Sequence, residues 1–522
     1  MKFLVFLLNG ILFAFLISCD NSKQKSEQII ISKQQKKLNV LFIIADDLNC
    51  DLGVYGNKIV KTPNIDKLSQ KSVVFKNTHC QYPLCGPSRA SFMTGMYTNQ
   101  TKITNNNILI RSTVPEVITL GQRFRQQGYR SVRVGKIFHC DNPGTIGTSG
   151  MDDIYSWDQT INPYGRDKLE EYKIKTLSPR KYGATLSWMA AEGKDEEQTD
   201  GIGASEAIQQ LEKFSKSGDN FFLAVGFYRP HTPFVSPKGY FDLYNREKIP
   251  IPKSSSNYLT TLPEPAANSI RAKKNQINLD EVISKEIKQA YYASISFVDA
   301  QVGRILNSLR KTGLDKNTIV VFTSDHGYHL GEHGHWQKQT LFENATKVPL
   351  IITVPDMENE LIINSSPVEL IDIYPTLMEL TKIKTPRHVV GKSLCPILWK
   401  QSDSVRNNVL TRWRNGYSLK TSRYRITQWG EDGNLGYELY DHGLDKNELN
   451  NLAEKPEYKI VLDSLKIVLK QRVIDAGIKP DGLGIQIENV QPMLRQKSIT
   501  PGDTYDENSK RTYFKASEPI KK

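Results

Sequence analysis

The sequence has few cysteines and no strong compositional bias. Only six of its 522 residues are cysteine, too few for a fold held together mainly by disulfide bonds. Hydrophobic residues make up 39% and charged residues 24%, which excludes a disordered, collagen-like or coiled-coil chain as the main class. The sequence contains no internal repeat. Its length suits one large α/β domain with a smaller companion.

A strong charge of one sign is also lacking in the part of the chain that is expected to fold. The formal net charge is +13, but residues 1–18, 20–37 and 478–522 together carry +6, which leaves +7 on residues 38–477. No run of Lys or Arg there indicates a nucleic-acid groove. A mildly basic protein still suits an anionic partner. The charge pattern therefore argues against nucleic acid and leaves a polyanion open.

The amino terminus has the pattern of an export signal over residues 1–18. Lys2 precedes a mostly apolar stretch, Phe3–Ile17, that is too short for a comfortable membrane span. The residues around Cys19 resemble a bacterial lipobox, in which the cysteine is lipidated and becomes the new amino terminus. The alternative is a plain secretory signal with an incidental cysteine. Residues 19–37, rich in Lys, Gln and Ser, are typical of a flexible tether.

These features predict an exported bacterial lipoprotein, either periplasmic or anchored at the outer membrane or cell surface. The lipid on Cys19 would be its only contact with a membrane.

From residue 38 onward, short apolar runs alternate with helical patterns. The runs typical of strands buried on both faces are Asn39–Ile44, Phe221–Phe227, Thr318–Thr323 and Val348–Val354. Between them, Glu286–Lys311 carries one continuous apolar stripe with helical spacing. This alternation predicts an α/β fold over residues 38–405, with a large doubly wound mixed sheet sandwiched by helices.

Residues 406–522 have a different texture and predict a smaller C-terminal subdomain of antiparallel sheet plus helix. Its expected strands are short, aromatic-rich and closely spaced: Val409–Trp413, Tyr417–Thr421, Tyr424–Gln428 and Tyr437–Tyr440. Lys455–Ala476 reads as an amphipathic helix, and we expect the tail after it to wrap the surface or to be partly disordered.

Polar clusters directly follow two of the buried strands, where an open α/β sheet places its site. Asp46 and Asp47 follow the first strand, although such a pair alone is more often a helix cap or turn. Asp325 and His326 follow a later strand. Carboxylate oxygens suit a hard cation such as Ca²⁺ or Mg²⁺. A histidine is unusual beside Ca²⁺, so His326 would bind either the ion or a substrate oxygen.

A five-residue pattern, Cys85-Gly86-Pro87-Ser88-Arg89, precedes a helical stretch. Pro87 fits the first position of that helix, so Cys85 would lie near its positive end, where an anion is favoured. Arg89, one turn on, offers a rigid donor fork to the same place. A lone cysteine is usually a buried apolar side chain, but the full pattern points to a site.

Four further polar residues follow strand-like runs or Gly-rich loops. Each alone would be a surface charge or a histidine with its hydrogen bonds satisfied. They are Lys136, His139, His231 and Lys338.

The pattern Cys85–Arg89 resembles the signature of type I sulfatases of the alkaline-phosphatase superfamily. In that family the cysteine is oxidised during export to formylglycine (3-oxoalanine) by a formylglycine-generating enzyme that reads these residues. Within the family, most of the chain is similar to the iduronate-2-sulfatase branch and its bacterial polysaccharide-sulfatase relatives. The segments that carry this similarity include Asn39–Asp47, Thr62–Asp66, Val134–His139, Arg229–Phe234 and Ser324–Lys338.

The resemblance implies a calcium site and a sulfatase fold. Asp46, Asp47, Asp325 and His326 would hold Ca²⁺, with the formylglycine made from Cys85 as a further ligand. His326 stands where most sulfatases have Asn, as in the iduronate-sulfatase branch.

The resemblance also implies the catalytic roles. Arg89 and Lys136 would hold the formylglycine hydrate, which attacks sulfur and gives a covalent sulfo-enzyme. His139, near neutral, would deprotonate the second hydroxyl so that sulfate leaves. His231, protonated, and Lys338 would bind the sulfate oxygens and assist the leaving sugar oxygen. Cations are needed because a sulfate ester repels an anionic nucleophile.

Two alternatives remain open at this point. One is a phosphodiesterase or phosphonate hydrolase of the same superfamily, since some of those enzymes also use a formylglycine. The other is a non-catalytic glycan-binding lipoprotein on a sulfatase fold.

The expected substrate is a sulfated polysaccharide or its oligosaccharides, of the algal carrageenan or ulvan type or a glycosaminoglycan. Residues 141–200, 248–279 and 328–336 are the expected specificity loops. Tyr328, His335 and Trp336 are expected to line the sugar subsite, although Trp336 is equally a core residue. An exported location also permits disulfide bonds among four of the cysteines, Cys50, Cys80, Cys140 and Cys395.

Overall fold

The computed structural model describes residues 37–178, 182–253, 257–355, 357 and 360–493. The described residues from Leu38 to Met493 belong to one compact unit. The predicted signal, lipidated Cys19 and most of the tether lie outside the described residues, as does most of the predicted wrapping tail. None of the described helices has the length and apolar character needed to cross a membrane.

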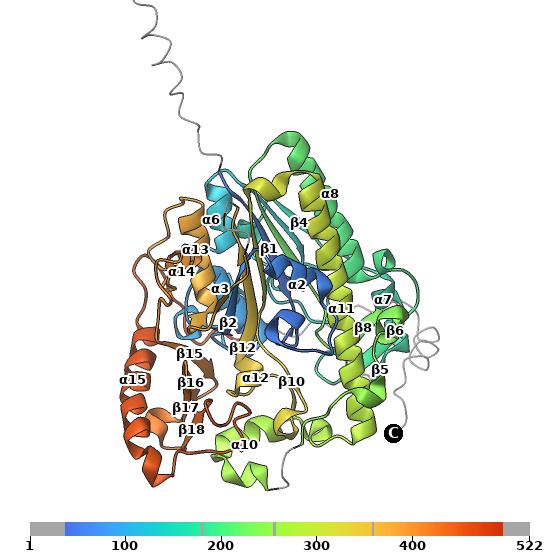
Figure 1. The fold of residues 1–522 in the computed structure, drawn as a ribbon. Coiled ribbons are helices and arrows are strands. Elements are labelled where there is room, and N and C mark those ends of the chain that lie inside the picture. The colour runs from blue at the N-terminus through green and yellow to red at the C-terminus, as the bar shows by residue number, and fades with distance from the viewer. Residues whose placement is uncertain (1–36, 179–181, 254–256, 356, 358–359, 494–522) are drawn as a thin grey trace, which may run out of the picture. The chain divides into compact units, whose positions relative to one another are not determined.

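The core of this unit is a nine-stranded mixed sheet (Figure 1). Its central strands are parallel: β9 (Thr318–Ser324), β1 (Asn39–Ala45), β7 (Phe221–Phe227) and β3 (Arg130–Gly135). Beyond β9 lies β12 (Lys347–Thr353), antiparallel to both of its neighbours, β9 and β2. The predicted large mixed sheet is therefore confirmed.

The remaining strands extend both edges of the sheet. They are β4 (Gln159–Ile161) next to β3, and β2 (Val73–His79), β13 (Ile362–Asn364) and β14 (Val368–Glu369) beyond β12.

Helices cover both faces of the sheet because successive side chains of its strands point to opposite faces. Leu41 and Ile43 of β1 belong to one core, to which α8 (Thr199–Ser217) and α11 (Glu281–Lys311) contribute. Phe42 and Ile44 belong to the other core, with α3 (Cys85–Thr94), α6 (Leu120–Gln126) and α13 (Ile373–Leu380). Figure 1 shows these two groups of helices on opposite sides of the sheet.

The long helix α11 begins five residues before the predicted start. The Asp280 side chain accepts a hydrogen bond from the backbone N–H of Ile283 at 2.9 Å, so it caps the helix. The apolar stripe marks only the part of the helix that packs on the sheet, which explains the difference.

The C-terminal part contains a four-stranded antiparallel sheet, β15 (Asn408–Trp413), β16 (Gly416–Thr421), β17 (Tyr424–Trp429) and β18 (Tyr437–Asp441). The helix α15 (Lys459–Gly477) packs on it. The predicted sheet and helix are confirmed, within a few residues. Strand β15 reaches the large domain: the Thr411 hydroxyl donates to the Cys80 carbonyl at 2.6 Å, shortly before α3.

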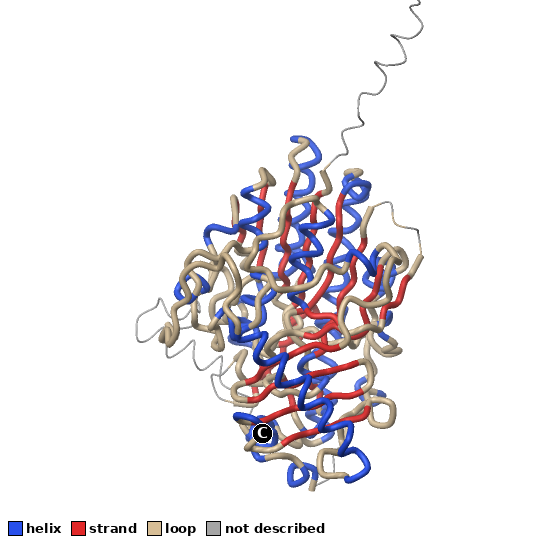
Figure 2. The backbone as a smooth tube through the Cα atoms, turned by 90° about the vertical axis from the view of Figure 1, so that its left-hand side faces the viewer, coloured by secondary structure: helices blue, strands red, loops and turns tan. Residues whose placement is uncertain are grey.

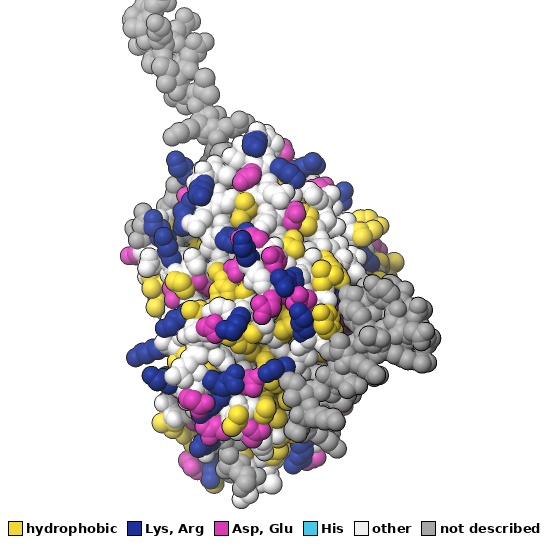
Figure 3. Space-filling view, turned by 90° about the vertical axis from the view of Figure 1, so that its right-hand side faces the viewer, with side chains coloured by type: hydrophobic (Ala, Val, Ile, Leu, Met, Phe, Trp, Pro, Cys, Tyr) yellow, Lys and Arg dark blue, Asp and Glu magenta, His cyan; other side chains and the backbone are white. Residues whose placement is uncertain are grey.

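The predicted specificity loops contain regular structure of their own. A small three-stranded sheet joins β5 (Lys175–Thr176), β6 (Ser187–Ala191) and β8 (Phe234–Pro237). Figure 2 shows the strands of the large sheet side by side and the long connections around them. On the face shown in Figure 3, acidic and basic side chains are interspersed, so the net positive charge is not gathered in one patch there.

Candidate active site

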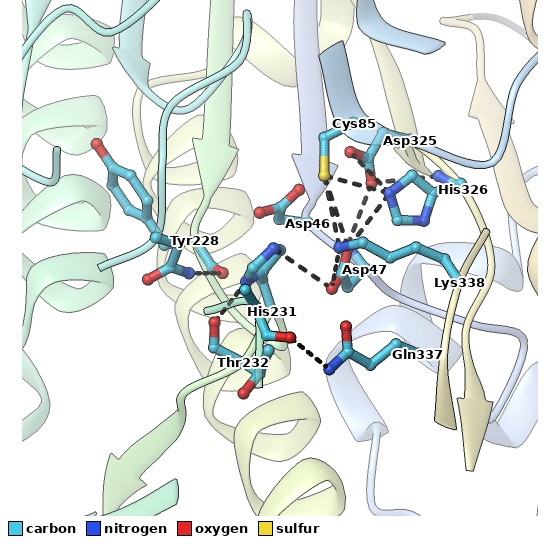
Figure 4. A network of polar contacts seen from close by, with 12 residues as sticks. Asp46, Asp47, Cys85, Tyr228, His231, Thr232, Asp325, His326, Gln337 and Lys338 are labelled. Carbon is cyan, nitrogen blue, oxygen red and sulfur yellow. Dashed lines mark hydrogen bonds and ion pairs between the residues drawn. The ribbon is translucent and has the colours of Figure 1, made fainter. Parts of the chain in front are cut away.

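The first part of the site forms where β1 and β9 end side by side. Ala45 pairs with Ser324 at the ends of these strands, so Asp46 and Asp47 emerge next to Asp325 and His326 (Figure 4). The backbone N–H of Asp47 donates to Asp325 Oδ1 at 3.1 Å. All four side chains are fully buried. The structure thus brings together the predicted metal ligands.

Asp47 is held in an unusual backbone conformation. Its φ of 63° lies in the left-handed region, which non-glycine residues seldom adopt. The Tyr291 hydroxyl in α11 donates to the Asp47 carbonyl at 2.8 Å and accepts from the Asn49 N–H at 2.9 Å. Tyr291 is a support that sequence reasoning missed, because its place in the helical apolar stripe gave it only a core role.

Cys85 begins helix α3 and faces these carboxylates. Its Sγ lies 3.3 Å from His326 Nε2, 3.6 Å from Lys338 Nζ and 3.8 Å from Asp47 Oδ1, and the residue is 1% exposed. The expected place of Pro87 is wrong, because the helix starts two residues earlier and Pro87 is its third residue. Proline is tolerated there because the first N–H groups of a helix have no acceptor within the helix.

Arg89 and Lys136 converge on Asp46. The Arg89 guanidinium bonds Asp46 Oδ1 and Asp325 Oδ2, both at 2.9 Å, and Lys136 Nζ lies 2.6 Å from Asp46 Oδ2. Burial disfavours the charged form of Asp46, but Lys136 and Arg89 outweigh this and hold its pKa well below the usual range. Asp46 is therefore a carboxylate fixed by two buried cations.

Lys338 contacts the Asp47 carboxylate. Its Nζ lies 2.5 and 2.7 Å from the two oxygens of Asp47. Burial raises the pKa of Asp47; Lys338 and His326 oppose this, whereas Asp46 and Asp325 add to it. The positive charge around Asp47, including the ammonium of Lys338, is therefore too small to offset the burial of this carboxylate.

This donor set suits a hard cation. One ligand atom each from Asp46, Asp47, Cys85 and His231 lies within 4.8 Å of the others, and Cys85, Asp325 and His326 form a second such group. The three buried carboxylates, of which Asp47 is not fully balanced by nearby cations, match the preference of Ca²⁺ or Mg²⁺ for oxygen ligands. The chain therefore offers a fitting site for a divalent ion.

Two histidines lie at the margin of the cluster. His139 Nε2 contacts Asp141 Oδ1 at 3.3 Å, and burial lowers the pKa of His139 to about 4, so its ring is neutral near pH 7. Within the described ranges, no hydrogen bond or ion pair links His139 to Cys85 or to the carboxylates of the cluster, which are Asp46, Asp47 and Asp325. The expected neutral state is thus supported, whereas direct contact with Cys85 is not seen.

His231 approaches from the loop after β7. Its Nε2 lies 3.6 Å from Asp47 Oδ2, and its Nδ1 bonds the Thr232 carbonyl, which leaves Nε2 facing the site. Burial and the charge of Lys338 lower the pKa of His231 well below its usual value. Without a bound anion the ring is therefore neutral, in contrast to the protonated form expected from the sequence.

Asp200 in α8 positions this loop. Its two carboxylate oxygens accept the backbone N–H groups of Tyr228 and Arg229, each at 2.9 Å. Asp200 is the second residue of α8 and the last residue of the predicted specificity loop 141–200. Sequence reasoning gave it no role of its own, because its partners lie 28 and 29 residues further along the chain.

The three predicted sugar-binding residues are all buried. Trp336 is 1% exposed and belongs to the core, which favours the core role that the sequence left open. Tyr328 is fully buried, with its ring stacked on Tyr291 at 5.4 Å between centroids. His335 is buried and its Nε2 lies 3.1 Å from the Lys338 carbonyl. Tyr328 also contacts Lys338, whose Nζ lies 6.0 Å from the centre of the Tyr328 ring.

The five cysteines in the described ranges, including Cys85, are all free.

Comparison with known protein families identifies the chain. The sulfatase family profile matches residues 38–383, which include all ten predicted catalytic and metal-binding positions. The chain belongs to the sulfatase family. This sulfatase also matches the profile for the C-terminal part of N-sulphoglucosamine sulphohydrolase, over residues 331–475.

The chain aligns with most of the length of its relatives. The chain is 35% identical over 484 residues to a sulfatase of Formosa agariphila, covering 90% of this chain and 92% of the relative. It is 36% identical over 498 residues to human iduronate 2-sulfatase, covering 85% of this chain and 86% of the relative. The predicted sulfatase resemblance is confirmed, and the protein is a sulfuric ester hydrolase.

Solved structures share the fold. A phosphonate monoester hydrolase of Silicibacter pomeroyi superposes with a TM-score of 0.71 at 21% identity, covering 84% of this sulfatase and 96% of that chain. A protein solved with its substrate D-glucosamine-2-N,6-O-disulfate gives 0.67 at 20% identity, covering 84% and 98%. At these identities the similarity shows the fold alone.

Proposed function

We propose that this sulfatase is exported and removes sulfate from a sulfated polysaccharide or its oligosaccharides, using a formylglycine made from Cys85 and a bound Ca²⁺. The observation that carries the proposal is the convergence of three carboxylates and three cations on Cys85 and its surroundings. A sulfate ester needs such a site, because its negative charge must be balanced before an oxygen nucleophile can approach.

A formylglycine fits at position 85. Cys85 lies within 3.6 Å of both His326 Nε2 and Lys338 Nζ, and its raised pKa, caused first by burial, makes it a poor thiolate nucleophile. The sulfatase family generally uses this modification together with a metal ion. When present, the hydrated aldehyde would supply the oxygen nucleophile that a buried thiol cannot.

The carboxylates would hold the divalent ion, which supplies positive charge at the sulfate. Arg89 and Lys136 keep Asp46 ionised and oriented. Lys338 is free to turn from Asp47 to a sulfate oxygen once an ion compensates the Asp47 charge. Its stem is buried and its ammonium already lies between the carboxylate and Cys85, so the movement required is small.

The two histidines would divide the proton transfers. His139 is neutral near pH 7 and so able to accept a proton. The Nε2 of His231 faces the site, and a bound sulfate ester would add the negative charge that favours the protonated ring, so His231 would donate to the leaving oxygen. These roles require substrate to bring both rings into contact with the reacting atoms.

The choice of substrate rests on the relatives. Relatives include a sulfatase named ulvan-active, 25% identical, and solved structures include a 2-O glycosaminoglycan sulfatase. We infer a sulfated glycan of the algal or glycosaminoglycan type. The lipobox-like sequence around Cys19 supports export and anchoring, and Cys85–Arg89 supports recognition by a formylglycine-generating enzyme.

Two measurements test the proposal. Mass spectrometry of the Cys85 peptide, from protein made in a host that contains the modifying enzyme, is expected to show the mass of formylglycine. The same protein is expected to release sulfate from sulfated oligosaccharides faster than it cleaves matched phosphate or phosphonate esters, and Cys85→Ala is expected to be inactive. A persistent thiol in active enzyme, or faster turnover of phosphonates, would contradict the proposal.

A further inference from the structure

A short segment of the chain lies against the loop that carries Lys338. The backbone N–H of Asn278 donates to the Gly334 carbonyl at 3.0 Å, and Gln337 Nε2 donates to Gln276 Oε1 at 2.6 Å. These contacts fix residues 273–278 alongside residues 334–338. Figure 4 shows Gln337 beside Lys338, pointing toward the side of the site formed by His231 and Thr232.

Lys273 is the cation at the start of this segment. Its Nζ donates to the Ala184 carbonyl at 3.2 Å, and Gln337 Nε2 donates to the same oxygen at 3.3 Å. Lys273 therefore stands next to the residue that precedes Lys338. Its side chain is only partly buried, so it remains open to a ligand. None of the mechanistic roles described above uses it.

Lys273 lacks a counter-charge. Across the described ranges the Ala184 carbonyl is its only hydrogen-bond partner, and no carboxylate lies within ion-pair distance. Burial and the charge of Lys338 lower the pKa of Lys273 to about 8, and Asp47 offsets this only in part. An ammonium has three donors, so at least two remain for a ligand. A partly buried cation without an acid partner is stabilised by a bound anion.

His335 provides a second unsatisfied group in the same place. It is 1% exposed, its Nε2 lies 3.1 Å from the Lys338 carbonyl, and its Nδ1 has no hydrogen-bond partner in the described part of the chain. His335 is linked to Lys338 by this hydrogen bond, and the residue before Lys338, Gln337, shares the Ala184 carbonyl with Lys273. Since Nε2 donates to the Lys338 carbonyl, His335 holds the loop in place, and its buried Nδ1 is an acceptor that the described residues leave unpaired.

We propose that Lys273 binds a second anionic group, a carboxylate or a second sulfate, on the sugar unit whose sulfate ester is cleaved. This inference rests on the proposed function and narrows the substrate class to sugars with two negative groups near each other. Lys338 and Lys273 then serve the two anions from neighbouring positions, with Gln337 between them. The subsite selects doubly charged sugars over esters with a single charge.

The test compares Lys273→Gln with the wild-type enzyme on three kinds of substrate. The first is an aryl sulfate, which carries one anion. The second is a uronic acid sulfate with its carboxyl-reduced analogue, and the third is a disulfated sugar with its monosulfated analogue. We expect the KM of Lys273→Gln to rise about 10- to 100-fold for whichever dianionic sugar the site accepts, because a charge-assisted hydrogen bond is lost. Its kcat and its rates on singly charged substrates should stay near wild type.

Two further variants complete the experiment. Lys273→Arg keeps the charge and is expected to retain most of the affinity. Lys76→Gln is the matched control, since Lys76 is also partly buried, donates to a backbone carbonyl at 2.7 Å and belongs to β2, outside the site. It is expected to match wild type on every substrate. Where a sugar binds but is not turned over, the Ki of that sugar as an inhibitor of aryl sulfate hydrolysis is measured in place of KM.

Two results would overturn the inference: an unchanged KM and Ki for both dianionic sugars, or an equal loss on the aryl sulfate, which would show a structural role. Failure of the proposed function looks different, because fully converted wild-type enzyme would then release no sulfate even from the aryl ester.

Discussion

The support that Tyr291 gives to Asp47 leads to a sharp prediction for Tyr291→Phe. The lost hydroxyl serves two backbone groups, the Asp47 carbonyl at 2.8 Å and the Asn49 N–H at 2.9 Å. The first contact is buried and the second partly buried, so both groups lose a partner that water cannot fully replace. An unsatisfied buried group costs about 1–3 kcal/mol and the partly buried N–H less, so we expect a loss of about 2–4 kcal/mol in the free energy of unfolding.

Activity should fall as well, because the left-handed φ of Asp47 depends on these contacts. A shift of this carboxylate displaces Lys338 and weakens the metal site, so we expect kcat to drop by about tenfold or more. The assay pairs urea unfolding with sulfate release from an aryl sulfate.

Tyr292→Phe is the control on the neighbouring residue. Tyr292 is 2% exposed, but its hydroxyl contacts the side chains of Asp51, at 3.4 Å, and Asn57, which can turn to other partners, so its loss should cost less than about 1 kcal/mol. If the two variants lose similar stability and activity, the reasoning about Tyr291 is refuted.

Three other predictions address pH, the His231 loop and the metal. Burial raises the pKa of Glu438 to about 7 from an ordinary 4.5, so the folded state holds this proton more tightly and stability falls as pH rises between these values, by at most about 3 kcal/mol. Glu438→Gln should flatten that part of the profile of urea midpoint against pH; an unchanged slope would contradict the assignment. Asp200→Asn replaces one of two acceptor oxygens with a donor facing a backbone N–H, so kcat should fall about tenfold or more with little change in far-UV circular dichroism, and wild-type kcat in this variant would exclude a positioning role. Removal of divalent ions with EGTA should abolish activity and lower Tm, and added Ca²⁺ should restore both. Because Lys338 partly balances Asp47, the Tm gain on adding Ca²⁺ should be larger in Lys338→Met than in wild type, and an equal gain would argue against that compensation.

The sequence predicts those strands whose burial on both faces leaves a continuous apolar run. Strand β7 matches its run residue for residue, over Phe221–Phe227. Strand β2 was not predicted, because Lys76 and Asn77 interrupt its apolar pattern and only the folded sheet shows that it is needed there. The antiparallel direction of β12 also has no signal in its own residues, since a buried strand looks the same in either direction.

The candidate site divides in a similar way. Motif residues such as Cys85 and Arg89 could be named from sequence because their chemistry requires those residue types in that order. Supporting residues such as Tyr291 and Asp200 could not, since their role depends on contacts between segments far apart in the chain. The sugar subsite was the weakest prediction: aromatic residues near a motif serve a core as well as a ligand, and Trp336 lies in the core.

The deep placement of Cys85 has a consequence for how this protein is made. In the folded chain the residue is 1% exposed, at the start of a helix that packs between the large sheet and its neighbours, so no enzyme can grasp the surrounding residues. If Cys85 is converted as proposed, the conversion has to take place on the nascent or unfolded chain. A chain that folds before Cys85 is modified would keep its thiol and would be well folded but permanently inactive. The yield of active enzyme from any host would depend on the rate of modification relative to the rate of folding.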